Sequence, residues 1–244
     1  MHRTALPLVL IFLVFFYCSE SDDKKNENNN FFSINSERYP INRAGIIDFG
    51  PDLSNSIYKA NLLVIIFVTE GIEFNQEEEI TIFVNHWPSR RGGQKRSESG
   101  RIKAANLQQR IIDSVQGVRP DGKIIILGDF NDNPTNKSLK LLTKKSGYCP
   151  LFKPLFNTME KLFKNGVGSL AYRDRWFLFD QILLSEKFKT GKGLRFLKAA
   201  VHNPSFLKNP EGKYKGYPFR NQIKGNQLLG YSDHFPVYII LEKN

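Results

Sequence analysis

The sequence predicts an α/β fold in which two stacked, mainly antiparallel sheets are flanked by helices. Three observations lead to this prediction. Several short apolar runs are rich in β-branched residues, which is typical of buried strands. One longer segment repeats its apolar residues at the spacing of a helix. Hydrophobic residues make up 41% of the 244 residues, with 20 Phe and 9 Tyr, so the chain has enough apolar material for a packed core and global disorder is excluded.

The elements follow one another without an internal repeat. The strand candidates are residues 62–68, 79–85, 123–130, 179–184 and 236–241. Residues 100–116 form the helix candidate, and its expected apolar stripe consists of Ala104, Leu107, Ile111 and Val115. Strands outnumber helices, which favours stacked sheets with one or two crossover helices.

The first 18 residues predict export. A basic start is followed by 13 uncharged residues, Ala5 to Tyr17, which is too short to cross a bilayer and matches the apolar part of a secretory signal. Cys18 then begins a polar stretch, so the segment resembles a lipoprotein signal in which Cys18 is lipidated, although Phe16 and Tyr17 stand where small residues are usual. We expect a chain that is secreted or anchored to the membrane of the cell envelope; the alternative is a buried apolar helix.

Residues 19–57 read as a tether and a weakly patterned region, and residues 58–244 as the folded domain. The only two cysteines are Cys18 and Cys149, which excludes a disulfide framework. No Cys or His spacing fits a structural zinc site.

The chain is basic, with a formal charge of +11 and a pI near 9.6. A basic surface favours polyanions such as nucleic acid, phosphorylated metabolites or anionic lipid. The alternative, a merely soluble basic surface, fits the charge equally well. No feature predicts a protein partner.

Three polar clusters stand at the ends of expected strands, where a scaffold usually presents its functional loops. They are Asn85-His86-Trp87-Pro88-Ser89-Arg90-Arg91-Gly92-Gly93, Gly128-Asp129-Phe130-Asn131-Asp132-Asn133-Pro134 and Tyr231-Ser232-Asp233-His234-Phe235-Pro236. Asp180 is a fourth, weaker candidate. Each cluster alone could be an ordinary turn; their order and their positions beside apolar strands favour a functional site.

Taken together, the three clusters resemble the later motifs of the endonuclease/exonuclease/phosphatase superfamily, whose fold is that of deoxyribonuclease I. The resemblance covers about residues 58–241 and implies a four-layer α/β sandwich that hydrolyses a phosphate ester with Mg²⁺ or Mn²⁺. It also implies individual roles. His86 would donate to the phosphate or act as general acid, Asp129 would orient or activate water, and Asn131 would donate to a phosphate oxygen. Asp233 would belong to the metal site, and His234 would pair with Asp180.

These residue types suit the reaction. A phosphate ester is anionic, so a hard cation and N–H donors must neutralise the charge that develops during attack. Mg²⁺ prefers carboxylate oxygens, and an imidazole held by a carboxylate titrates in the range that proton transfer needs. Arg90, Arg91 and Arg101 are candidate substrate-binding residues; the alternative is a solvated basic loop.

The sequence departs from the family pattern at its start. The family normally opens with a strand bearing an Asn, followed by a Gln-Glu whose Glu is a principal metal ligand, and the residues before Tyr58 show neither. Gln76-Glu77 lies in a loop after the expected position, so we do not assign the ligand to it. We therefore expect a domain that is incomplete at its N-terminus and weakly active.

Two alternatives remain: a catalytically impaired protein that binds phosphate or nucleic acid, and an exported fragment without a stable fold. Nucleic acid, phosphoinositide, sphingomyelin and nucleotide hydrolases share these motifs, so the sequence leaves the substrate open. Serine-hydrolase and P-loop motifs are absent from the sequence.

Overall fold

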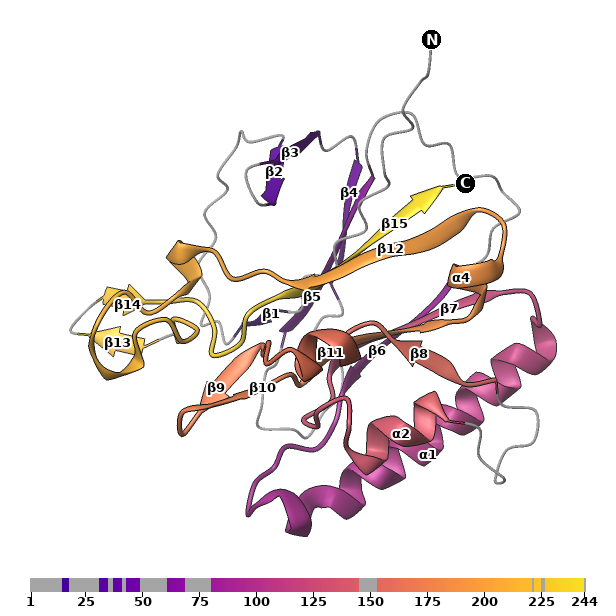
Figure 1. Cartoon of the computed structure of the whole chain (residues 1–244), viewed down its shortest axis with the longest axis horizontal. Coiled ribbons are helices and arrows are strands. Elements are labelled where there is room, and N and C mark those ends of the chain that lie inside the picture. The colour runs from indigo at the N-terminus through magenta and orange to yellow at the C-terminus, as the bar shows by residue number, and fades with distance from the viewer. Residues whose placement is uncertain are drawn as a thin grey trace.

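The computed structural model describes residues 80–144, 153–220 and 230–243 (Figure 1). It also describes the backbone of seven short strands outside these ranges. These are β1 (Phe15–Tyr17), β2 (Phe31–Ile34), β3 (Glu37–Pro40), β4 (Arg43–Asp48), β5 (Asn61–Val68), β13 (Gln222–Lys224) and β14 (Gln227–Leu229).

The central sheet has the strand order β6-β7-β11-β8. Its strands are β6 (Ile80–His86), β7 (Lys123–Asp129), β11 (Asp180–Ser185) and β8 (Leu155–Asn157). The strands β6 and β7 are parallel, because the long helix α1 (Gln94–Val118) carries the chain back between them. The other two pairings in this sheet are antiparallel.

A second sheet pairs β12 (Leu194–Val201) with β15 (Val237–Lys243), with a register shift between Phe196 and Lys198. A small hairpin, β9 (Leu170–Tyr172) and β10 (Arg175–Phe177), precedes β11. The backbone-only strands form the sheets β1-β5-β4, β2-β3 and β13-β14. The short helices are α2 (Lys137–Thr143), α3 (Glu160–Lys164), α4 (Lys187–Thr190) and two 3₁₀ turns, Ser205–Leu207 and Gly212–Tyr214.

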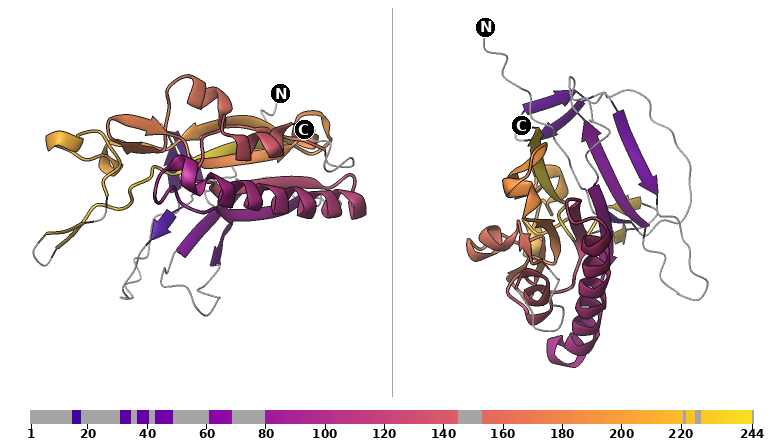
Figure 2. Two further views of the ribbon diagram at one scale, coloured as in Figure 1. Left: turned by 90° about the horizontal axis from the view of Figure 1, so that it is seen from below. Right: turned by 90° about the vertical axis from the view of Figure 1, so that its right-hand side faces the viewer.

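Two apolar clusters hold the layers together. On one face of the central sheet, Ile125 and Leu127 of β7 pack with Ile239 and Leu241 of β15. On the other face, Ile124 and Ile126 pack with residues of α1 and α2 such as Ile112. Figures 1 and 2 show the resulting order, with β12 and β15 on one side of the central sheet and α1 and α2 on the other. The apolar residues of β7 thus alternate between the two cores, as the period of two requires.

The expected fold class is confirmed: stacked, mainly antiparallel sheets are flanked by helices. The five strand candidates correspond to β5, β6, β7, β11 and β15, with boundaries displaced by a residue or two. Six further strands in residues 153–229 and the helix α2 had no clear pattern in the sequence.

The prediction for the helix was wrong in two respects. The helix begins at Gln94 rather than at Gly100, and Gly93 in an extended positive-φ conformation precedes it. Its buried face also differs, because Leu107 is 51% and Ile111 39% exposed. The residues buried instead are Arg101, Ala105, Gln108, Gln109 and Ile112. Three of these five residues are polar. A search for an apolar stripe therefore could not identify this face of the helix as the buried one.

The predictions for the signal segment, for Cys18 and for the tether fall outside the described residues, apart from the backbone of β1 to β4. Within the part of the chain that the structure describes, no helix is long and apolar enough to cross a membrane.

Candidate functional site

Three predicted site residues form a row across the central sheet. The register pairs His86 of β6 with Asp129 of β7, and Asp129 with Asp180 of β11. Residues paired in this way point to the same face of a sheet. That face is the one on which Ile125 and Leu127 meet the second sheet, so the row lies at the end of the core between the sheets. His86 Nε2 lies 3.9 Å from Asp129 Oδ2.

The second sheet contributes His234, which lies in the loop before β15. Its Nδ1 is 2.7 Å from Asp180 Oδ2, the hydrogen bond that we expected from the resemblance. Asp180 is fully buried, and the Ser169 hydroxyl donates to the same oxygen at 2.5 Å. The Phe235 N–H in turn donates to the Ser169 carbonyl, which fixes the loop beside the carboxylate. His234 is therefore held in one orientation.

The loop after β7 fixes Asp129. The Asn131 N–H donates to Asp129 Oδ1 at 2.7 Å, and Asn131 Nδ2 lies 3.2 Å from Oδ2 and 2.9 Å from the Trp87 carbonyl. Asn131 has a φ of 51°, a left-handed conformation that Asn tolerates better than most residues. In this structure Asn131 thus orients Asp129, while its expected bond to a phosphate oxygen remains a prediction.

Gly128 allows β6 and β7 to approach each other next to the site. Its φ is 134°, and a Cβ at this position would lie 1.9 Å from the Asn85 carbonyl oxygen. Only glycine fits there. The close approach places Asn85 and His86 directly beside Asp129.

Several ionisable groups of the site are buried close to one another, and both burial and the neighbouring charges shift their pKa values. Burial raises the pKa of Asp129 to about 7; the nearby Asp180 and Asp233 also raise it, and His234 opposes the rise. Burial lowers the pKa of His234, but the charges of Asp180, Asp129 and Asp233 outweigh burial and raise it to about 10. Burial and the charge of His234 lower the pKa of His86. At neutral pH the site therefore combines a charged His234, a neutral His86 and an Asp129 near its titration point.

Two of the three expected substrate-binding arginines have structural partners. Arg101 is fully buried, and its Nε lies 2.8 Å from Asp132 Oδ2. Arg90 pairs with Asp132 Oδ1 at 2.9 Å and donates to the Asn131 carbonyl at 2.8 Å. Both guanidinium groups hold the loop that follows Asp129. Arg101 has no exposed surface with which to reach a phosphate, so its prediction as a phosphate binder is corrected, while that of Arg90 stays a prediction. Arg91 is exposed and remains a candidate.

Sequence reasoning missed the residues that brace this loop. Asp132 is buried and accepts a further hydrogen bond from Ser138 at 2.6 Å. The Gln181 side chain donates to the Asp132 carbonyl. Asp132 stood inside a quoted motif and Gln181 directly follows Asp180, but their partners lie far away in the chain. Ser169 carried no signal in the sequence.

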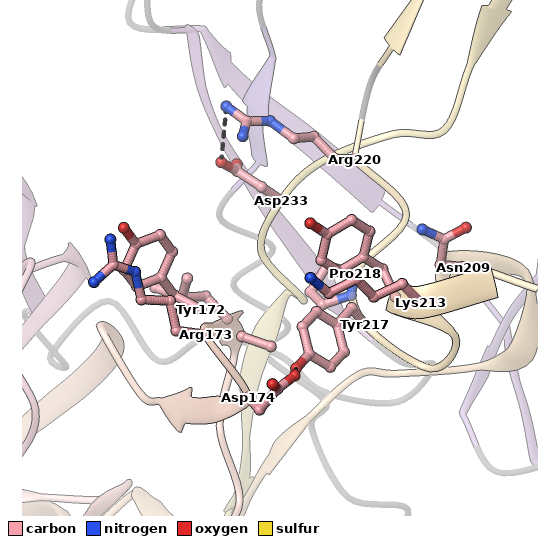
Figure 3. Close-up of a pocket in the computed structure, with 12 residues that line it drawn as sticks. Tyr172, Arg173, Asp174, Asn209, Lys213, Tyr217, Pro218, Arg220 and Asp233 are labelled. Carbon is pink, nitrogen blue, oxygen red and sulfur yellow. Dashed lines mark hydrogen bonds and ion pairs between the residues drawn. The ribbon is translucent and has the colours of Figure 1, made fainter. Parts of the chain in front are cut away.

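Asp233, the expected metal ligand, is half exposed and lies 3.6 Å from Arg220 (Figure 3). Mg²⁺ in proteins usually takes one or two carboxylates and keeps several waters. The described residues fit such a cation only in part, because no group of three metal-ligating side chains occurs among them. Asp233 is one half-exposed carboxylate with a competing cation beside it.

The Endonuclease/Exonuclease/phosphatase family matches residues 64–243. No curated protein matches. Among solved structures, a mannosyl-6-phosphatase from Bacteroides thetaiotaomicron is 16% identical, with a TM-score of 0.48 over 81% of this chain and 76% of that one. An endonuclease/exonuclease/phosphatase family protein from the same organism is 15% identical, with a TM-score of 0.47 over 82% and 76%.

The human Nocturnin catalytic domain is 14% identical, with a TM-score of 0.42 over 83% of this chain and 72% of that one. These structural likenesses are distant, and the family match over residues 64–243 is what decides the assignment. It spans the three motif clusters and the strands that carry them. The chain belongs to the endonuclease/exonuclease/phosphatase family.

Proposed function

We propose that this chain hydrolyses a phosphate ester at the site formed by His86, Asp129, Asp180 and His234. The observation that carries the proposal is the row of three side chains across β6, β7 and β11, completed by the 2.7 Å hydrogen bond between Asp180 and His234. Two sheets and three motif clusters converge on this one place. Ionisable groups with shifted pKa values cluster at functional sites, which supports a catalytic role for this one.

Asp129 is the group that takes a proton from the attacking water. Its carboxylate is oriented by two hydrogen bonds from Asn131, and its pKa of about 7 suits a proton acceptor at neutral pH. Burial also removes the water that would otherwise screen its charge.

His234 and His86 act on the phosphate. His234 keeps its Nδ1 proton on Asp180, and its raised pKa makes it a cation that stabilises the negative charge developing on the phosphate oxygens. His86 is neutral at pH 7 and serves as an N–H donor to the phosphate. It can protonate the leaving group only in its charged form, below its lowered pKa. Asp180 is a positioning residue, since it is fully buried and acts through His234.

We extend the proposal to a divalent cation, Mg²⁺ or Mn²⁺, held in part by Asp233. When bound, such an ion polarises the phosphate and compensates its charge. The remaining ligands would be substrate, water or residues outside the described ranges. None of the steps given above for the side chains depends on this ion.

The test is the hydrolysis of a panel of phosphomonoesters and phosphodiesters by the purified chain, during a Mg²⁺ titration and after chelation. Phosphate release is measured for the monoesters and release of the alcohol for the diesters. Asp129→Asn and His234→Ala should each lower the rate by about 100-fold or more, the usual scale for losing a proton-transfer or charge-stabilising group. Asp121→Asn is the matched control, because Asp121 is exposed and pairs only with Lys187 among the described contacts. A metal-dependent rate that survives both site substitutions would place the chemistry elsewhere.

One observation favours the second candidate, a phosphate- or nucleic-acid-binding protein without activity. Among the described residues the metal site is incomplete, and Arg220 lies against Asp233. The outcome that supports this candidate is tight, salt-dependent binding of a polyanion by the folded chain, together with no turnover of any ester at any Mg²⁺ concentration.

We also propose export through residues 1–18, with Cys18 as the lipidation site. The length of the apolar stretch and the polar switch at Cys18 support this. Cells that express the full chain or its Cys18→Ala variant are labelled with a fatty-acid analogue. Equal labelling of the two rules out lipidation, and a cytoplasmic location of the full chain rules out export.

A further inference from the structure

A cavity of about 670 Å³ adjoins the candidate site (Figure 3). Its walls come from the β9–β10 hairpin, from residues 209–220 and from Asp233. The chain links the lining of the cavity to the site at two points. Asp233 precedes His234 in the chain, and the hairpin follows directly after Ser169, which donates to Asp180.

The cavity is lined by aromatic side chains. Tyr172 and Tyr214 are 58% and 54% exposed. A cation lies over each ring, with Arg173 5.2 Å from the centre of Tyr172 and Lys213 5.7 Å from the centre of Tyr214. Tyr217 forms a third wall that is fixed in place. Its ring lies 5.6 Å from Trp176, and its hydroxyl donates to Asp174. Trp176 itself stacks on the buried Phe235, which follows His234. The aromatic wall is thus built onto the site.

The tip of the hairpin has a backbone conformation that residues other than glycine rarely adopt. Arg173 and Asp174 have φ values of 50° and 58°, the left-handed conformation of a two-residue turn that usually takes Asn and Gly. Both keep side chains that line the cavity, and Asp174 anchors Tyr217. Figure 3 shows Tyr172 and Arg173 on one side of the view and Tyr217 and Lys213 on the other.

The charges of the lining favour an anion with a flat ring. Three cations, Arg173, Lys213 and Arg220, face the two acids Asp174 and Asp233. Each acid already has a partner, Tyr217 or Arg220. Aromatic faces beside cations bind nucleobases by stacking, while the cations attract the phosphate. The volume lies within the range of small-molecule sites and suits one nucleotide rather than a polymer.

We propose that this cavity binds the nucleoside part of a nucleotide whose phosphate lies at the site, so that the substrate class is nucleoside phosphates. This inference rests on the proposed function for the position of the phosphate. The tyrosines supply the specificity, with Tyr217 as a fixed wall and Tyr172 and Tyr214 as the accessible faces.

The test compares adenosine 5′-monophosphate with ribose 5-phosphate, which has the same sugar and phosphate but no base. Binding to the purified chain is measured by calorimetry, and phosphate release is measured separately. The expected affinity for adenosine monophosphate is about tenfold or more above that for ribose phosphate, the scale of one stacked base. Tyr214→Ala should remove this difference and Tyr214→Phe should keep it, because only the ring face is needed.

Tyr231→Ala is the matched control, since Tyr231 is equally exposed, at 52%, but packs on Phe206 outside the lining. Equal affinities for the two ligands, or a preference that survives Tyr214→Ala, overturn the proposal. Tighter binding of an oligonucleotide than of the mononucleotide would overturn the single-nucleotide cavity as well. Binding of adenosine monophosphate without phosphate release leaves this inference standing and refutes the proposed function. Equal turnover of adenosine monophosphate and ribose phosphate supports the proposed function and refutes this inference.

Discussion

Replacing Arg101 by Met removes a cation that is fully buried beneath the loop carrying Asp129. The side chain has no exposed surface, and its guanidinium lies 2.8 Å from the equally buried Asp132. Removing one partner of a buried ion pair leaves an uncompensated charge and usually costs about 3–5 kcal/mol. Asp132 keeps Arg90 at 2.9 Å and Ser138 at 2.6 Å, so the lower end of that range, about 3 kcal/mol, is expected.

The assay is urea denaturation of the purified chain at pH 7, with the free energy of unfolding extrapolated to water. Arg91→Met is the control, because Arg91 is exposed, and it should change stability by less than about 0.5 kcal/mol. The double variant Arg101→Met/Asp132→Leu should recover part of the loss, since it leaves no lone buried charge. A loss below about 1 kcal/mol for Arg101→Met, accompanied by a higher KM for substrate, would refute the structural role and restore Arg101 as a phosphate binder.

Two further substitutions probe the strand pair and the charge of the site. Gly128→Ala should lower the free energy of unfolding by at least about 2 kcal/mol, because its Cβ would lie 1.9 Å from the Asn85 carbonyl oxygen. Gly117→Ala is the control: a Cβ there has nothing within 4 Å, so this variant should be neutral or stabilising. Thermal unfolding of both variants measures the difference. The Asp129 pKa of about 7, above its usual 3.8, means that the folded chain retains a proton that the unfolded chain has lost, so wild-type stability falls as pH rises from about 4 to about 7. Asp129→Asn cannot ionise, so its stability relative to wild type should rise across that window, by at most about 4 kcal/mol at 1.36 kcal/mol for each pKa unit. The free energy of unfolding of both proteins is measured at pH 5 and pH 8 in the presence of a chelator. The same difference between variant and wild type at both pH values would contradict this prediction.

The strands that carry the site were predictable because their signal is local. Residues 123–130 form an unbroken apolar run, and β7 is buried along its whole length. Once β6, β7 and β11 are located, the polar residues at their ends follow, which is why His86, Asp129 and Asp180 could be chosen from the sequence. The pairing of Asp180 with His234 came from the family resemblance and not from any local pattern.

The supports of the site were not predictable, because their partners are distant in the chain. Arg101 looks like a solvent-facing residue of an amphipathic helix until Asp132, 31 positions later, is placed beside it. Gln109 is buried because it donates to the Leu141 carbonyl, which no spacing rule reveals. The strand β12 carries a register shift next to Lys198, which breaks the alternation that a sequence pattern needs.

The row of His86, Asp129 and Asp180 has a consequence for how this protein can change. Neighbouring strands lie about 4.8 Å apart, so the spacing of the three side chains is set by backbone hydrogen bonds and cannot be adjusted by a single mutation. A shift of one residue between strands would turn each side chain to the opposite face. The hairpin tip at Arg173 and the segment 209–220, by contrast, can gain or lose residues without moving the row. Variation that preserves the reaction is therefore confined to these two surface segments. A graft of either segment from a related chain should alter the choice of ligand and leave the positions of His86, Asp129 and Asp180 unchanged.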